Sequence, residues 1–181
     1  MTESEATFRK MIERDPHHAP AHYELGLVLA RDPMRLREAE ASYRKAMELE
    51  PSAAQYVYRL GLLLHEELHR PDEAEAAYRR AIALAPEDPF FYGGLISLLV
   101  GQSRRAEALP FSEKMRALLG AAENWYGLAT LDAILGNTAP ALEYLRKAAR
   151  ETNFDSGWAR NDPDLSSIRD DPRFEAVLGH M

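Results

Sequence analysis

The segment His65-Glu66-Glu67-Leu68-His69 holds residue types that could do metal chemistry. In the pattern H-E-x-x-H, two histidines one helical turn apart hold a zinc ion, and the glutamate serves as the base that activates water. The longer form of the motif, with a downstream glycine and a third histidine, is absent, and Arg70-Pro71 follows at once. Such a short pattern also arises by chance in a helix rich in Glu and Leu. Zinc-dependent hydrolysis therefore remains a remote alternative, and the sequence predicts no enzyme, no bound metal and no cofactor.

A second group of residues has the chemistry of contact rather than of catalysis. Tyr23, Tyr58 and Tyr126 recur at nearly regular intervals, and Phe90 stands near the place where one tyrosine is missing. Tyrosine gives a large contact area, little rotamer entropy to lose and a polar tip, so it is common at interfaces. With neighbours one helical turn away, the candidate partner-binding residues are Tyr23, Leu27, Arg31, Gln55, Tyr58, Leu62, Phe90, Ser97, Tyr126 and Thr130. The alternative is that these rings only pack between neighbouring helices.

A repeat of nearly constant length positions these residues. The spacing Ala-x3-aromatic-x2-Ala appears at Ala39 and Ala74, and looser copies begin at Ala108 and Ala141. The copies begin 35, 34 and 33 residues apart. Self-similarity at this period indicates stacked helical repeats, each made of two helices. The first helix of each pair then carries the tyrosines, and the second carries the alanines.

The pattern resembles the tetratricopeptide repeat, whose signature runs W-x2-L-G-x2-Y, then A-x3-F-x2-A, then P. Leu25-Gly26 and Leu60-Gly61 match its first helix, while Pro51 and Pro86 close the first two repeats. The resemblance covers roughly residues 19–153 and is to repeats of bacterial type. It implies an all-α fold, a right-handed α-solenoid of about four helix pairs, in which the first helices line a concave groove.

We expect a single repeat domain over residues 1–181, with closing segments at both ends. The expected segments are an N-terminal helix at 3–15, repeats at 19–53, 54–88, 89–121 and 122–155, and a C-terminal capping segment at 156–181. Trp158, Leu165, Ile168, Phe174 and Val177 could cover the open face of the last repeat, because exposed repeat ends must be closed. The N-terminal helix, with Phe8 and Met11, has no partner from its own repeat, so it either caps the array or meets another chain.

Composition excludes several classes of function. The chain has 181 residues, 46% of them hydrophobic and 28% charged, with a net charge of −7 and no cysteine. Nucleic-acid binding draws on a positive field, so neither DNA nor RNA is an expected ligand. No apolar run approaches the length of a membrane span, and the polar start does not look like a secretory signal. We therefore expect a cytoplasmic protein that contacts no membrane.

The expected function is that of a non-enzymatic protein–protein interaction scaffold. An apolar or amphipathic peptide or helix suits the tyrosine-lined groove, because Arg31 is the only evident cation among the groove positions. A clamp for acidic tails, which the family builds from Lys, Arg and Asn, is therefore not expected. The alternative left open is a self-assembling structural protein that forms homo-oligomers through the N-terminal helix.

Overall fold

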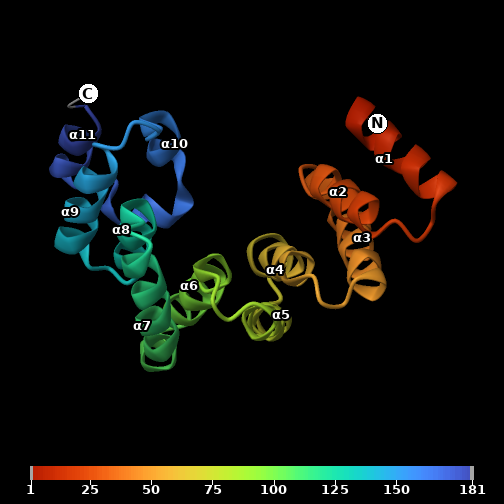
Figure 1. Ribbon diagram of the computed structural model, residues 1–181, viewed down its shortest axis with the longest axis horizontal. Coiled ribbons are helices and arrows are strands. Elements are labelled where there is room, and N and C mark those ends of the chain that lie inside the picture. The colour runs from red at the N-terminus through yellow and green to blue at the C-terminus, as the bar shows by residue number, and fades with distance from the viewer. Residues whose placement is uncertain (1, 180–181) are drawn as a thin grey trace. The chain divides into compact units, whose positions relative to one another are not determined.

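The computed structural model describes residues 2–179, which form helices joined by short turns and contain no β-strand (Figure 1). The predicted all-α helical-repeat fold is confirmed. The chain divides into two compact units, Met1–Leu98 and Leu99–Met181. No helix among the described residues has the length and apolar character needed to cross a bilayer.

The first unit consists of an N-terminal helix followed by helix pairs. Its elements are α1 (Glu3–Arg14), α2 (Ala19–Leu29), a 3-10 turn (Pro33–Arg35), α3 (Leu36–Leu49), α4 (Ala54–Leu62), a π-helical turn (Leu63–Glu67), α5 (Pro71–Leu84), a 3-10 turn (Pro89–Phe91) and the start of α6 (Gly93–Gly101). Helix α2 packs against α3, and α4 packs against α5. Helix α1 lies against α2, so the helix without a partner of its own closes the start of this unit.

In the first unit, a tyrosine from α3 or α5 fills the space that a glycine leaves on the preceding helix. Tyr43 and Tyr78 are almost fully buried. A Cβ atom added at Gly26 would lie 2.6 Å from the ring of Tyr43, and one added at Gly61 would lie 2.8 Å from the ring of Tyr78. Gly94 faces the same ring of Tyr78, at 2.6 Å from an added Cβ. Tyr78 is therefore held between two glycines from different helices, which explains the Leu-Gly positions of the repeat.

The helix that begins as α4 ends in a π-helical turn at Leu63–Glu67. The amide of Leu68 donates to the carbonyl of Leu63 at 3.0 Å, a step of five residues instead of four. A single inserted residue inside a helix characteristically widens one turn in this way. His69 then adopts a φ of +52°, and α5 begins at Pro71.

An ionic clasp ties each second helix to the next one in the first unit. The guanidinium of Arg35 donates to both carboxylate oxygens of Glu5 at 2.9 Å and also bonds Glu38, while Arg9 bonds the same two glutamates. The same contacts recur 35 residues later in the set Glu40, Arg70, Glu73 and Arg44, with Arg70 at 2.7 Å from Glu40. Glu5 is buried, so its charge depends on this pairing.

The second unit consists of helix pairs followed by short closing helices. Its elements are the end of α6, α7 (Arg105–Ala121), α8 (Trp125–Ile134), α9 (Thr138–Ala148), α10 (Ser156–Asn161), a 3-10 segment (Pro163–Ile168) and α11 (Pro172–Leu178). Asp162 and Asp171 begin the last two elements, because their carboxylates accept the amides of Asp164 and Arg173. Helices α7 and α8 are joined by a bidentate ion pair between Arg116 and the buried Asp132, with N–O distances of 2.7 and 2.9 Å.

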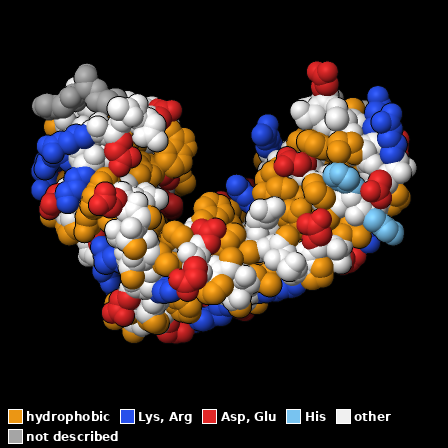
Figure 2. Space-filling model, viewed as in Figure 1, with side chains coloured by type: hydrophobic (Ala, Val, Ile, Leu, Met, Phe, Trp, Pro, Cys, Tyr) orange, Lys and Arg blue, Asp and Glu red, His pale blue; other side chains and the backbone are white. Residues whose placement is uncertain are grey.

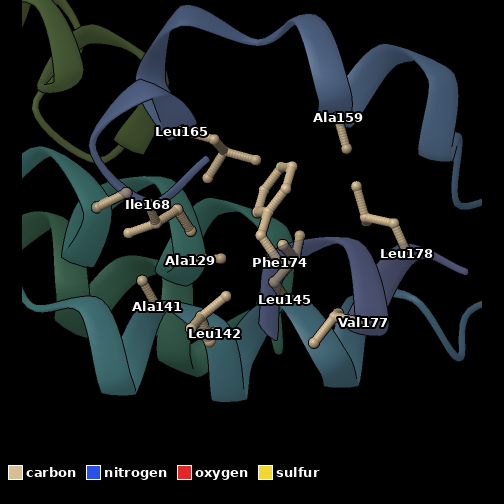
Figure 3. Close-up of a cluster of buried hydrophobic side chains, with 11 residues drawn as sticks. Ala129, Ala141, Leu142, Leu145, Ala159, Leu165, Ile168, Phe174, Val177 and Leu178 are labelled. Carbon is tan, nitrogen blue, oxygen red and sulfur yellow. The ribbon is translucent and has the colours of Figure 1, made fainter. Parts of the chain in front are cut away.

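The closing segment covers the last helix pair, as expected, with one exception. Figure 3 shows Phe174 in the middle of a buried cluster in which Leu165, Ile168, Val177 and Leu178 meet residues of α8 and α9. Trp158 does not join this cluster and is 58% exposed. Trp158 instead lies at the surface, with its ring 5.0 Å from that of Tyr126 of α8, and Ala159, its neighbour, is the α10 residue that points into the core.

Gly94→Ala is expected to destabilise the fold, whereas Gly93→Ala is not. The added methyl at 94 overlaps the Tyr78 ring, and overpacking of this kind costs about 1–3 kcal/mol. At 93 an added Cβ meets nothing within 4 Å, so alanine should change stability by less than about 0.5 kcal/mol. Urea unfolding of the two variants checks this, and equal midpoints would contradict the role assigned to Gly94.

Glu5→Gln is expected to remove a pH-dependent part of the stability. The Arg35 guanidinium holds the pKa of Glu5 at about 2, below its ordinary 4.5. A depressed pKa in the folded state stabilises the protein above pH 4.5, and this stabilisation is lost as the pH falls toward 2. The melting temperatures of the wild type and Glu5→Gln should therefore differ at neutral pH and converge on acidification. The exposed Glu3→Gln serves as the control, and a gap that stays constant with pH would refute the assignment.

Candidate partner-binding surfaces

In the first unit, Tyr58, one of the predicted partner-binding residues, is the buried member of an aromatic group. Tyr58 is buried, and its ring lies 5.4 Å from that of Tyr78, 4.9 Å from that of Phe90 and 5.5 Å from that of Phe91. Phe90 is 52% exposed, unlike Tyr58 beneath it. The aromatic surface that solvent reaches here therefore belongs to Phe90, and Tyr58 supports it from below.

Tyr23 occupies the equivalent position one repeat earlier. Its half-buried ring lies 4.8 Å from that of Tyr56 and 6.0 Å from that of Tyr43. Burial raises the pKa of Tyr43 to about 12, so this phenol stays neutral in the interior. Hydrophobic side chains gather over α2 on the face shown in Figure 2.

In the second unit, the predicted Tyr126 lies in a cleft of about 560 Å³ between the start of α8 and α10. Its ring lies 5.0 Å from that of Trp158 and 6.2 Å from that of Phe154. Its hydroxyl donates to Asp162 at 2.6 Å, and burial together with this bond raises the pKa of Tyr126. Figure 2 shows hydrophobic side chains gathered around α10.

The exposed aromatic residues of the two units occupy the same position of the repeat. Phe90 follows Tyr58 by 32 residues, and Trp158 follows Tyr126 by 32 residues. In each case the later ring lies about 5 Å from the tyrosine. Trp158 is not among the predicted binding residues, although its spacing from Tyr126 indicates the equivalence.

The other predicted residues differ in what they expose. Leu27, Leu62 and Ser97 are half-buried and Gln55 is exposed, so all four present some surface. Thr130 is buried, and its hydroxyl donates to the carbonyl of Gly127 at 3.0 Å. Arg31 does not lie on the first helix as expected: α2 ends at Leu29, and Arg31 is exposed in the turn that follows.

The H-E-x-x-H segment has a local structure that differs from a zinc-binding helix. His65 lies within the π-helical turn, and His69 has left-handed backbone, so the regular turn that aligns two histidines is interrupted. The Nδ1 atom of His65 lies 3.4 Å from the hydroxyl oxygen of Tyr78. Burial, and then the nearby His69, lower the pKa of His65. Over residues 2–179, no group of three or more His, Cys, Asp or Glu side chains is placed to hold a metal ion. His180 lies outside the described residues.

Comparisons with known proteins agree with this architecture. A family model described as tetratricopeptide repeat matches residues 35–89. The structure of PilF from Pseudomonas aeruginosa is 24% identical with a TM-score of 0.62, and the match covers 95% of this chain and 78% of PilF. The structure of YrrB is 20% identical with a TM-score of 0.57, covering 96% of this chain and 93% of YrrB.

Residues 35–89 therefore match the tetratricopeptide repeat, and the fold of the chain is that of the tetratricopeptide-repeat structures it resembles. Tetratricopeptide-repeat arrays are protein–protein interaction scaffolds with extended binding surfaces, and this chain has that architecture. A crystal structure of MamA is also similar, with 22% identity, a TM-score of 0.57, and coverage of 79% of this chain and 83% of MamA. YrrB is described as a tetratricopeptide-repeat protein with an unusual peptide-binding site. None of the curated proteins compared with the chain matches it.

Trp158→Ala is expected to leave the tetratricopeptide-repeat fold almost unchanged, in contrast to Phe174→Ala. Trp158 is 58% exposed, so its removal should cost less than about 1 kcal/mol, whereas removing the fully buried Phe174 should cost about 3–5 kcal/mol. Chemical unfolding of both variants measures the difference. Equal losses would show that Trp158 is part of the core and would disqualify it as a binding residue.

Proposed function

We propose that this protein is a non-enzymatic scaffold that binds an apolar or amphipathic segment of a partner protein. The observation that carries the proposal is the pair of exposed rings, Phe90 and Trp158, each lying on a tyrosine of a first helix. Exposed aromatic surface that continues into a packed group of rings, unlike a single isolated side chain, is typical of protein–protein contact sites. Rings held in place by a tyrosine beneath them also lose little conformational freedom on binding.

The support beneath each ring distinguishes these residues from isolated exposed apolar side chains. Met34 is 91% exposed in a turn, and Leu109 is 51% exposed on the second helix α7. Single exposed apolar side chains of this kind are common on protein surfaces. Phe90 and Trp158 instead form part of packed aromatic groups at equivalent positions of the repeat.

The contacts of the N-terminal helix α1 favour a role as a cap over a role as an assembly interface. Glu5 and Arg9 hold it to Arg35 and Glu38 by the same clasp that joins later helices. Phe8 is half-buried, and Met11 is 36% exposed. We therefore assign partner binding to the aromatic surfaces and not to this helix.

Selection from a displayed random-peptide library on the immobilised chain tests the proposal. Enriched peptides should be rich in apolar residues, and Phe90→Ala combined with Trp158→Ala should weaken their binding at least tenfold, as expected when interface aromatic residues are removed. Fluorescence polarisation gives the dissociation constants. Leu109→Ala is the matched control, because it removes a similarly exposed apolar side chain from a second helix. The proposal fails if no peptide is enriched, or if the double variant binds as tightly as the control.

A further inference from the structure

The cleft of the second unit combines aromatic rings with carboxylates and no cation. Tyr126, Phe154 and Trp158 provide the rings, and Glu123, Glu151 and Asp155 provide three carboxylates. The side chains that line the cleft include no Lys, Arg or His. Each of these carboxylates is on an exposed residue. The cleft therefore has negative charge beside the faces of its aromatic rings.

We infer that this cleft receives a basic side chain, arginine or lysine, of the bound partner segment. A cation above an aromatic face is attracted by the ring quadrupole, and neighbouring carboxylates add to the attraction. Arginine fits best, since its planar group stacks on a ring while its N–H groups reach carboxylates beside it. The inference rests on the proposed function and makes it narrower: the partner segment is amphipathic and basic at this point.

The turn that follows α7 fixes the position of Glu123. Glu123 has a φ of +50°, and left-handed backbone also follows other helices, at His69, Ser103 and Gly136. The conformation therefore belongs to the end of the helix, and it places the carboxylate of Glu123 in the lining of the cleft.

Nearby cations are engaged away from the cleft. Arg169 donates to the backbone carbonyl of Asp162 at 2.9 Å, and Arg160 bonds Glu175 at 3.2 Å. Arg150 lines a different depression, between α9 and α11. Asp155 accepts the amide of Trp158 at 2.9 Å through one oxygen, which fixes the carboxylate beside the indole. No described arginine or lysine therefore lines the cleft to neutralise its carboxylates.

The test uses the full chain and a capped leucine–arginine–leucine tripeptide, with norleucine or glutamate in the middle position as comparisons. Nuclear magnetic resonance follows the indole N–H of Trp158, assigned by its loss in Trp158→Phe, and gives the dissociation constants. The arginine peptide should bind about tenfold more tightly than the norleucine peptide at low salt, and the advantage should shrink at high salt. The glutamate peptide should bind most weakly.

Charge variants distinguish attraction of the arginine peptide to the cleft carboxylates from its attraction to the net negative charge of the whole protein. Glu123→Gln with Glu151→Gln should reduce the arginine peptide to the affinity of the norleucine peptide. Glu113→Gln with Glu143→Gln makes the same change of charge on exposed residues that do not line the cleft, and should leave the preference intact. Glu123→Gly should keep or raise the urea midpoint while lowering the preference, which a merely structural role for Glu123 would not produce.

The outcomes distinguish this inference from the broader proposal. If library peptides bind through Trp158 but arginine gives no advantage, or both double variants lose it equally, the basic-residue inference is wrong and the scaffold function stands. If none of the tripeptides shifts the Trp158 indole, the basic-residue inference is wrong, and if in addition no library peptide depends on Phe90 or Trp158, both are wrong.

Discussion

Close packing of a tyrosine ring against a glycine is the constraint on which the first unit depends. Tyr78 is fully buried between Gly61 and Gly94, and at either glycine a Cβ atom would come within 2.8 Å of the ring. Because the ring fills this space completely, the helices can approach in only one register. That register also sets which residues of α4 and the following turn face outward. Tyr58 and Phe90 come into contact as a consequence, so the same packing that holds the helices together also presents the exposed ring.

Electrostatic clasps fix the next level of order, from one helix pair to another. The contacts of Glu5 with Arg35 recur between Glu40 and Arg70, one period later. Similar residue types stand at Glu75 and Arg104, within the ion pairs Arg79–Glu75 and Arg104–Glu107. Exposed ion pairs contribute little individually, but Glu5 is buried and accepts bonds from two arginines, which makes its position specific. The clasps therefore select how successive helices align more than they add to stability.

The repeat could be predicted from the sequence because packing imposes a period on residue types. Alanines such as Ala74 and Ala81, and glycines such as Gly61, admit few substitutes, so their spacing is visible in a single chain. Exposure could not be predicted in the same way, because it depends on which neighbour covers a ring. Tyr58 and Thr130 share the register of the groove positions, yet both are buried. The clasps were also missed, since each joins residues about 30 positions apart whose charges look like those of any solvated helix.

The two aromatic surfaces differ in the charge around them. This difference indicates that the surface at Phe90 supplies apolar contact, whereas the surface at Trp158 also selects for charge. Phe90 lies on Tyr58 and Phe91, with Asp88 engaged in capping the turn through the amide of Phe90. Trp158 lies beside three carboxylates that line an open cleft. An aromatic surface alone selects for apolar contact and tolerates many sequences, whereas a carboxylate near a ring rejects acidic segments and favours basic ones. In the second unit the proposed partner segment is therefore expected to gain apolar contact from Trp158 and charge discrimination from Glu123 and its neighbours.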